Sequence, residues 1–220
     1  MSKQLDLILD NLKEAEGGKL HRNSKELNIT NAYGIYRHFH PKAKIWEYID
    51  KVALNVTRAP SDKWDDNMIN KINLLIDPVI ERELSKELYS LYFKRLPMDL
   101  INIDTILVIA NCFTNTQTGT LEAIQEGLND CYKYGLFKFT PTKPRKDNNV
   151  LTVDGDFGTE SKRALEAFMS VSDRKDRLIF RSCMLLWMKS NYIKLAVNNQ
   201  TGMLPNLRGW DNRMESAQHI

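Results

Sequence analysis

The sequence predicts a mainly α-helical fold, because apolar residues recur with helical spacing along most of the 220 residues. Few segments show the alternation of polar and apolar residues that is typical of strands. Apolar residues make up 42% of the chain and charged residues 27%, which argues against a disordered or fibrous protein. We find no internal repeat, so the helices are expected to form a bundle rather than a solenoid.

The first predicted helix begins at Ser2, a suitable cap, and ends near Glu16. Its apolar face has the spacing i, i+3, i+4, i+7 and consists of Leu5, Ile8, Leu9 and Leu12. Gly17 and Gly18 are expected to stop the helix, because glycine adopts the left-handed conformation of a helix end without a Cβ clash. Residues 19–30 have no helical period and predict a loop or a short, irregular hairpin. Glu16 is therefore expected at the end of a rigid element.

Helical spacing resumes after Pro41, with an apolar face of Ile45, Ile49, Val52 and Val56. A second segment is expected to begin at a capping Ser61 and to be kinked or divided by Pro78. Its apolar positions are Met68, Ile72, Leu75, Val79 and Ile80. The amphipathic pattern then continues to Arg95, with Leu84, Leu88, Leu91 and Tyr92 as its apolar side.

Residues 99–115 predict the most apolar helix, buried on most sides at the centre of the fold. A helix packed beside it is indicated by Leu121, Ile124, Leu128 and Cys131. Residues 138–149 are basic and nearly free of apolar side chains, so they predict an exposed linker or hairpin-like loop, which could separate two lobes. Two more helices are expected around Ala164, Leu165 and Phe168 and around Ile179, Phe180, Met184, Trp187 and Met188. Residues from 198 onward are expected to form a loop.

Charge, cysteines and hydropathy limit the function classes. A net charge of +3 favours approach to an anionic surface such as a bacterial envelope, but it is too weak to predict nucleic-acid binding. Cys112, Cys131 and Cys183 lack the paired spacing of a zinc site and are expected to be reduced core thiols. The most apolar run, residues 101–113, is interrupted by polar residues, so no stable membrane insertion is expected. The N-terminus lacks the apolar region of a signal peptide, which predicts synthesis in the cytoplasm.

The sequence predicts no metal site and no cofactor. His38 and His40 have no third ligand nearby, so they are expected to lie on a helix surface or to pack. Asp154 and the glycines after it lack the oxygen ligands of a calcium loop and predict an Asx-type turn that caps the next helix. The tryptophans within helical patterns, Trp46, Trp64 and Trp187, are expected to be packing residues.

Glu16 is a candidate for acid catalysis at a sugar. Cutting a glycosidic bond requires a carboxylic acid that keeps its proton near neutral pH and donates it to the leaving oxygen. A glutamate at the end of an apolar-faced helix, half buried over a cleft, suits this task, because desolvation disfavours the charged form of a carboxyl group. By spacing alone a surface charge is the better interpretation, since Glu16 is one of 28 acidic residues.

Four motifs follow one another along the chain. They are Glu16-Gly17-Gly18 with the downstream segments 30–41 and 46–50, the apolar segment 106–115, the turn Val153-Asp-Gly-Asp-Phe-Gly158 and the terminal Gly209-Trp-Asp-Asn-Arg213. In this order they resemble glycoside hydrolase family 108, which includes phage-type endolysins and a muramidase linked to typhoid toxin release. Each motif alone is weak, and their order and spacing carry the resemblance.

The resemblance implies a peptidoglycan hydrolase that cleaves the β-1,4 bond between N-acetylmuramic acid and N-acetylglucosamine, with Glu16 as the general acid. It also implies a lysozyme-like helical fold, with a small N-terminal lobe that includes a short hairpin and a helical C-terminal lobe. Residues 1–96 would form the catalytic part, and residues 97–220 a peptidoglycan-binding-like part packed against it. We expect a monomer that binds glycan strands of bacterial peptidoglycan after release through a holin or similar pore, in phage lysis or in protein export.

One family pattern, Asp-x-Gly-Gly-x-Thr, is not intact. Counting back from Gly34 places Glu26 at the Asp position and Asn31 at the Thr position, whereas counting forward from Glu16 places Lys25 and Thr30 there. We therefore assign a catalytic role to Glu16 alone, without a second catalytic group. The residues expected to bind substrate are Glu26, Thr30, Asn31, Tyr33, Asn111, Asn115 and Trp210, the last through stacking on a sugar face.

Two alternatives remain open. The altered loop is compatible with a catalytically impaired protein that binds peptidoglycan without cutting it. A helical adaptor with no glycan role would require the four motif matches to be accidental.

Overall fold

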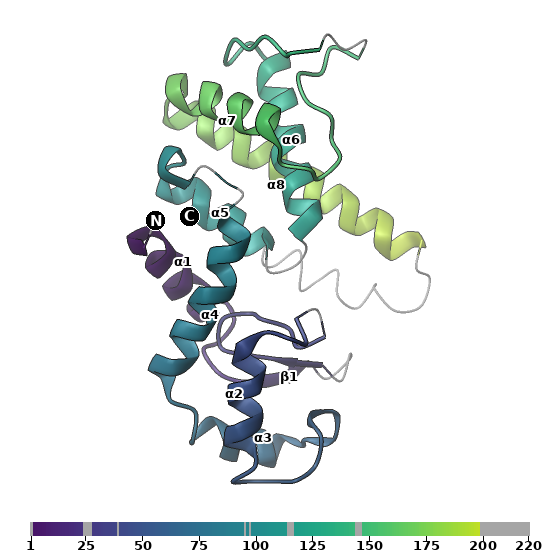
Figure 1. Ribbon diagram of the computed structural model, residues 1–220. Coiled ribbons are helices and arrows are strands. Elements are labelled where there is room, and N and C mark those ends of the chain that lie inside the picture. Colours follow the sequence, from purple (N-terminus) through teal and green to yellow (C-terminus); the bar gives the residue numbers. More distant parts are fainter. Residues whose placement is uncertain are drawn as a thin grey trace. The chain divides into compact units, whose positions relative to one another are not determined.

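The computed structural model describes residues 2–23, 28–38, 40–94, 96, 98–113, 117–143 and 147–198 (Figure 1). Over these residues the chain is mainly helical, with eight α-helices and a single two-stranded sheet. The predicted α-helical class is therefore confirmed. The chain divides into two compact units, Met1–Phe93 and Lys94–Ile220, where the sequence predicted parts 1–96 and 97–220.

The first unit surrounds a small hairpin with helices (Figure 1). Its elements are α1 (Ser2–Ala15), β1 (His21–Asn23), β2 (Asn28–Thr30), α2 (Lys44–Ala53), the 3₁₀-helix η1 (Ser61–Lys63), α3 (Asp66–Asn73) and α4 (Pro78–Phe93). Helix α4 packs against both α1 and α2, and α3 packs against β1. The strands are antiparallel, with His21 opposite Thr30, so the predicted short hairpin is confirmed.

The hairpin is anchored to the helices by polar contacts to its first strand. The Asn73 side chain at the end of α3 accepts a hydrogen bond from the Leu20 amide and donates one to the Leu20 carbonyl, at 2.9 and 2.8 Å. The Arg22 guanidinium donates to two carbonyl groups of η1. The strand that follows Gly18 is thus fixed on a helical base.

Two predicted boundaries in this unit were wrong in detail. Ser61 begins the 3₁₀-helix, and the cap of α3 is Asp65, whose carboxylate accepts a hydrogen bond from the Met68 amide. Helix α2 ends at Ala53, so Val56 lies beyond it. Pro78 divides the predicted long helix by starting α4, where its missing N–H is no loss.

The buried face of α4 differs from the prediction. The leucines expected to face the core lie on other sides of the helix, and Leu91 is 61% exposed. The buried residues are Glu81, Ser85, Tyr89 and Phe93, one helical turn apart. Three of these four side chains are polar, and each forms a hydrogen bond with a loop that follows the hairpin.

The second unit is a helical bundle of α5 (Ile103–Phe113), α6 (Gln117–Lys133), α7 (Thr159–Val171) and α8 (Arg174–Asn198), with the 3₁₀-helix η2 (Met98–Leu100) before them (Figure 1). Helices α6 and α8 pack most closely, and a Cβ atom at Gly127 would lie 3.0 Å from side-chain atoms of Met184 and Phe180. The predicted helices of this unit are confirmed, although the one expected over residues 99–115 begins only at Ile103. The exposed loop predicted at residues 138–149 lies inside this unit, so the prediction that it separates two lobes was wrong.

Gln125 of α6 organises the turn before α7. Its Oε1 accepts hydrogen bonds from the amides of Asp154 and Gly155, and its Nε2 donates to Asp154, to the Asp156 carbonyl and to Ser161. Asp154 also accepts from the Asp156 amide, which confirms the Asx turn. The turn does not cap α7, however, because Gly158 occupies the N-cap without a side-chain hydrogen bond.

Replacing Gln125 by alanine is expected to destabilise the protein by about 2 kcal/mol, since partly buried amides of the turn lose their acceptor. Urea unfolding followed by circular dichroism measures this change. Lys133→Ala, at an exposed site of the same helix, is the control and should change the free energy of unfolding by less than about 0.5 kcal/mol. Equal effects of the two substitutions would contradict the role of Gln125.

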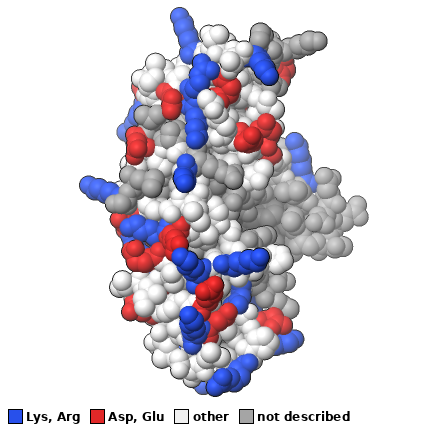
Figure 2. Space-filling view, in the orientation of Figure 1, with Lys and Arg blue, Asp and Glu red and all other residues white. Residues whose placement is uncertain are grey.

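Three further expectations concerned the burial of the cysteine thiols, the charge of the surface and the absence of a membrane-spanning helix. Cys112 and Cys131 are buried, and burial raises the pKa of each thiol to about 12, whereas Cys183 is only half-buried. Lys and Arg side chains alternate with Asp and Glu over the face shown in Figure 2, so the described residues there form no extended patch of one sign. No described helix is both long enough and apolar enough to span a bilayer.

Candidate active site

Glu16 lies immediately after α1, as the sequence predicted. Its amide donates to the Leu12 carbonyl at 2.9 Å, which continues the hydrogen bonding of the helix by one residue. Gly17 and Gly18 follow with φ angles of 85° and 66°, the left-handed conformation expected of a glycine stop. Glu16 itself is only 9% exposed. A rigid helix therefore fixes the backbone from which this carboxyl group projects.

The Glu16 side chain packs against the backbone at Gly34. A Cβ atom at Gly34 would lie 2.9 Å from Glu16 Cγ, 3.0 Å from Cδ and 3.1 Å from Oε1. The φ angle of Gly34 is 74°, a backbone conformation that residues other than glycine rarely adopt. Glycine is therefore needed here both for the conformation of the loop and for its close approach to the carboxyl group.

Gly34 belongs to a tight loop of residues 31–35, hereafter the 31–35 loop, which Asn31 organises. The Asn31 Oδ1 accepts hydrogen bonds from the amides of Tyr33 and Ile35, at 3.1 and 3.0 Å. Its Nδ2 donates to Ser85 Oγ of α4 at 2.9 Å. Asn31 is fully buried and Tyr33 is 1% exposed, so both side chains contact other protein atoms.

Three buried residues of α4, hereafter the α4 polar stripe, hold this loop: Glu81, Ser85 and Tyr89. Glu81 Oε1 accepts a hydrogen bond from the Ala32 amide at 3.1 Å, and the Tyr89 hydroxyl donates to the Tyr33 carbonyl at 2.7 Å. With the Ser85 contact, each residue of the stripe binds a different residue of the loop. Apolar periodicity did not predict this role of α4, although polar residues that recur every four positions between the leucines were a signal of it.

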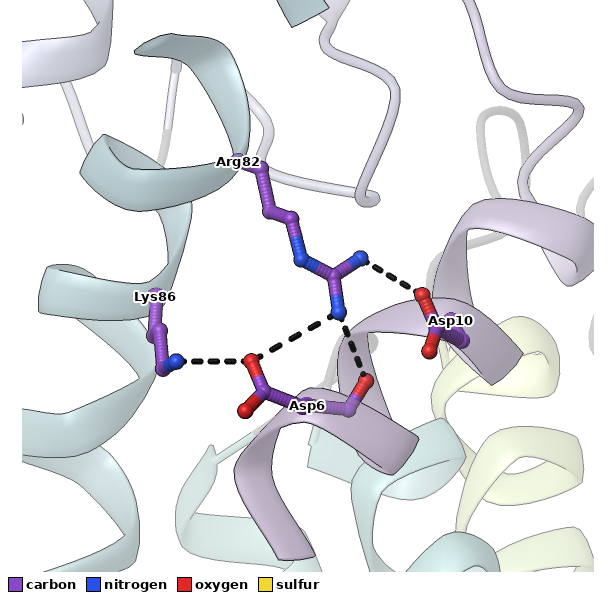
Figure 3. Close-up of polar contacts among 4 residues, drawn as sticks. All are labelled: Asp6, Asp10, Arg82 and Lys86. Carbon is purple, nitrogen blue, oxygen red and sulfur yellow. Dashed lines mark hydrogen bonds and ion pairs between the residues drawn. The ribbon is translucent and has the colours of Figure 1, made fainter. Parts of the chain in front are cut away.

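Figure 3 shows how α4 is tied to the helix that carries Glu16. Arg82 contacts Asp10 at 2.5 Å and donates to the Asp6 carbonyl at 3.1 Å, and Lys86 contacts the Asp6 carboxylate at 2.6 Å. The Lys86 hydrogen bond lowers the pKa of Asp6, and the charges of Lys86 and Arg82 act in the same direction. These contacts join α4, which binds the 31–35 loop, to α1, which precedes Glu16.

Replacing Arg82 by methionine is expected to lower the melting temperature by roughly 2–4 °C at low ionic strength, because three contacts between α1 and α4 are lost: those to Asp10, to the Asp6 carbonyl and to the Asp6 carboxylate. The difference from the wild type should shrink in high salt, which screens partly exposed charges. Lys44→Met, which removes a more exposed ion pair with Glu87, is the matched control and should have a smaller effect.

The difference in melting temperature between the wild type and Arg82→Met is also expected to depend on pH. The pKa of Asp6 is lowered in the folded state, so its contribution is present above the ordinary aspartate range, about pH 4, and is lost as the pH falls through the folded-state pKa. The difference between wild type and Arg82→Met should therefore diminish in acid. A difference that is constant with both salt and pH would contradict the electrostatic account.

Thr30 is fully buried at the end of β2, opposite His21. Its hydroxyl group has no hydrogen-bond partner among the described residues. A buried hydroxyl in this state has capacity to bind a water molecule. Of the predicted substrate-binding residues in this unit, Thr30 is thus the one with a polar group that the described protein leaves unsatisfied.

The remaining predicted site residues are Glu26, Asn111, Asn115 and Trp210. Glu26, Asn115 and Trp210 lie outside the described residues. Asn111 belongs to the second unit, where its Nδ2 donates to the Leu107 carbonyl of its own helix at 3.0 Å.

The histidines were expected to lie on a helix surface or to pack. His40 contacts the Tyr92 hydroxyl through Nδ1 at 2.7 Å, and burial lowers the pKa of this histidine. Within the described ranges, no group of three or more potential ligand side chains is placed to hold a metal ion.

In the first unit, the Glu16 carboxyl group lies between a helix end and the 31–35 loop. A second buried carboxyl group, that of Glu81, lies on the other side of this loop. A carboxyl group fixed in this way is able to transfer a proton in one orientation. No protein-family model, no curated protein and no solved structure matches the chain. The resemblance to glycoside hydrolase family 108 stays a prediction that rests on the four sequence motifs.

Proposed function

We propose that the protein is an N-acetylmuramidase, a peptidoglycan hydrolase that cleaves the β-1,4 bond between N-acetylmuramic acid and N-acetylglucosamine with Glu16 as general acid. The observation that carries this proposal is the position of Glu16, at the end of α1 and against Gly34. The motifs that resemble glycoside hydrolase family 108 give this carboxyl group its proposed substrate.

The geometry around Glu16 supports acid catalysis. Proton donation to a glycosidic oxygen requires a carboxyl group within hydrogen-bond reach of the leaving oxygen, held in a defined orientation. The helix end restrains the Glu16 backbone, and Gly34 restrains the side chain from Cγ to Oε1. The hairpin that starts a few residues later would border the glycan.

We propose no second catalytic carboxyl group. Glu81 is unsuited to activate a water molecule, because its Oε1 already accepts a hydrogen bond from the Ala32 amide. Thr30 offers a fully buried hydroxyl group that would bind a water molecule. An inverting mechanism would need a base about 6.5–9.5 Å from Glu16, and a retaining one a nucleophile at about 5–5.5 Å.

The proposal extends to the fold and to the cell. We propose a lysozyme-like arrangement in which the first unit carries catalysis and the second unit binds glycan strands. The protein would act as a monomer on the cell wall, as a phage-type endolysin or in protein export, after release through a holin or similar pore.

The test is incubation of purified wild-type protein and of Glu16→Gln with peptidoglycan, followed by measurement of new reducing ends. Release by the wild type alone is the expected result. Equal release by both proteins would contradict the role of Glu16. No release by either, with binding to peptidoglycan retained, would favour the impaired binding protein, and no binding at all would favour a helical adaptor.

A further inference from the structure

The 31–35 loop lies between two buried carboxyl groups. Its Ala32 amide donates to Glu81 Oε1 at 3.1 Å, and two residues later the backbone of Gly34 packs against Glu16. Asn31 closes this short segment on itself by accepting from the amides of Tyr33 and Ile35. A displacement at Ala32 is therefore transmitted to Gly34 over two residues of constrained backbone.

We propose that Glu81 is a positioning residue of this site, which holds the 31–35 loop against Glu16 through its hydrogen bond with the Ala32 amide. The inference rests on the proposed function and deepens it. Glu81 does not touch substrate; it acts through the loop on the orientation of the Glu16 carboxyl group.

The Glu81 contact has no substitute in the described structure. Ala32 is buried, so its amide would find no water if the acceptor were removed. Ser85 and Tyr89 bind other atoms of the loop, the Asn31 side chain and the Tyr33 carbonyl. Glu81 is thus the residue of the α4 polar stripe that accepts from the loop backbone.

The Glu81 carboxyl group is buried behind the 31–35 loop, and burial disfavours its charged form. Burial raises its pKa, while the Ala32 hydrogen bond and the charge of Lys13 on α1 act in the opposite direction. The charge of Glu81 in turn acts on Tyr33 in the loop, whose pKa is raised mainly by burial. Because the folded-state pKa is raised, the contribution of Glu81 to stability is present at low pH and lost as the pH rises through that value.

The test compares Glu81→Met, which removes the acceptor, with Glu81→Gln, which keeps an acceptor oxygen at the same place. Glu83→Met, at an exposed position of the same helix, is the control. We expect Glu81→Met to lower kcat on soluble, uncrosslinked glycan strands by roughly 10- to 100-fold with KM changed less than about threefold. Glu81→Gln should restore most of kcat, and Glu83→Met should match the wild type.

Amide hydrogen exchange separates this inference from the proposed function. In the wild-type protein the Ala32 amide should be protected, and Glu81→Met should speed its exchange and that of Gly34, whereas Glu81→Gln should not. If the wild type and Glu16→Gln release equally few reducing ends, the proposed function fails, but the exchange result still tests the hold on the loop.

Three outcomes overturn the inference: an unprotected Ala32 amide in folded wild type, wild-type kcat and exchange in Glu81→Met, or a loss of kcat that Glu81→Gln does not restore. If Glu81→Met does not fold, protection of Ala32 in the wild type and in Glu81→Gln decides the matter. Protection in both supports the inference, and loss of protection in Glu81→Gln contradicts it.

Discussion

Glu16→Gln is expected to reduce the release of reducing ends from peptidoglycan by about 10²- to 10⁴-fold, the usual contribution of a general acid. Glutamine has the same length and fits the contact with Gly34, but its amide does not donate a proton to a leaving oxygen. Binding to peptidoglycan and the melting temperature should stay close to those of the wild type. The loss should therefore appear in kcat.

The control for this variant is Glu14→Gln. Glu14 is exposed on the last turn of the same helix, two residues before Glu16, so its substitution changes the local charge equally without touching the site. Wild-type hydrolysis by Glu14→Gln and loss in Glu16→Gln would support the assignment. Similar losses in both variants would show that hydrolysis depends on the charge of the helix end and not on proton donation by Glu16.

Gly34→Ala is expected to have the second-largest effect, because it combines backbone strain with a clash at the carboxyl group. Alanine at a φ angle of 74° costs about 1–3 kcal/mol of stability. Its Cβ would also lie 2.9 Å from Glu16 Cγ, so Glu16 must move. A displacement of about 1 Å is enough to reduce kcat roughly 100-fold.

Gly135→Ala is the matched control for strain. Gly135 has a φ angle of 72°, but a Cβ atom there meets nothing within 4 Å. Urea unfolding should show a comparable strain cost in both variants, whereas only Gly34→Ala should lose hydrolysis. Wild-type kcat in Gly34→Ala would mean that the contact between Gly34 and Glu16 has no part in catalysis.

The sequence predicted those parts of the fold that depend on neighbours along the chain. The apolar spacing from Leu5 to Leu12 and the glycines after Glu16 place α1 and its end correctly, because helix periodicity and helix stops are local. Pro78 was correctly expected to interrupt a helix. The cap at Asp65 was missed in favour of Ser61, since both residue types cap helices and only the tertiary structure selects one.

The surroundings of Glu16 were harder to predict, because they depend on residues far apart in the sequence. The hydrogen bonds from the 31–35 loop reach α4 over about fifty positions, as in the Ala32 to Glu81 contact. Hydrophobic periodicity also assigned the wrong face of α4 to the core, since Glu81, Ser85 and Tyr89 are buried for their hydrogen bonds. A pattern based on apolar residues does not detect a helix face whose buried residues are polar and form hydrogen bonds.

The most direct test of the account is to identify the sugar at the new reducing ends. Peptidoglycan digested with the wild-type protein would be reduced with borohydride, hydrolysed and analysed for amino-sugar alcohols. The account predicts muramitol, the reduced form of N-acetylmuramic acid after hydrolysis, and its near absence with Glu16→Gln. Glucosaminitol in its place, or no sugar alcohol above that of undigested peptidoglycan, would contradict a muramidase that acts through Glu16.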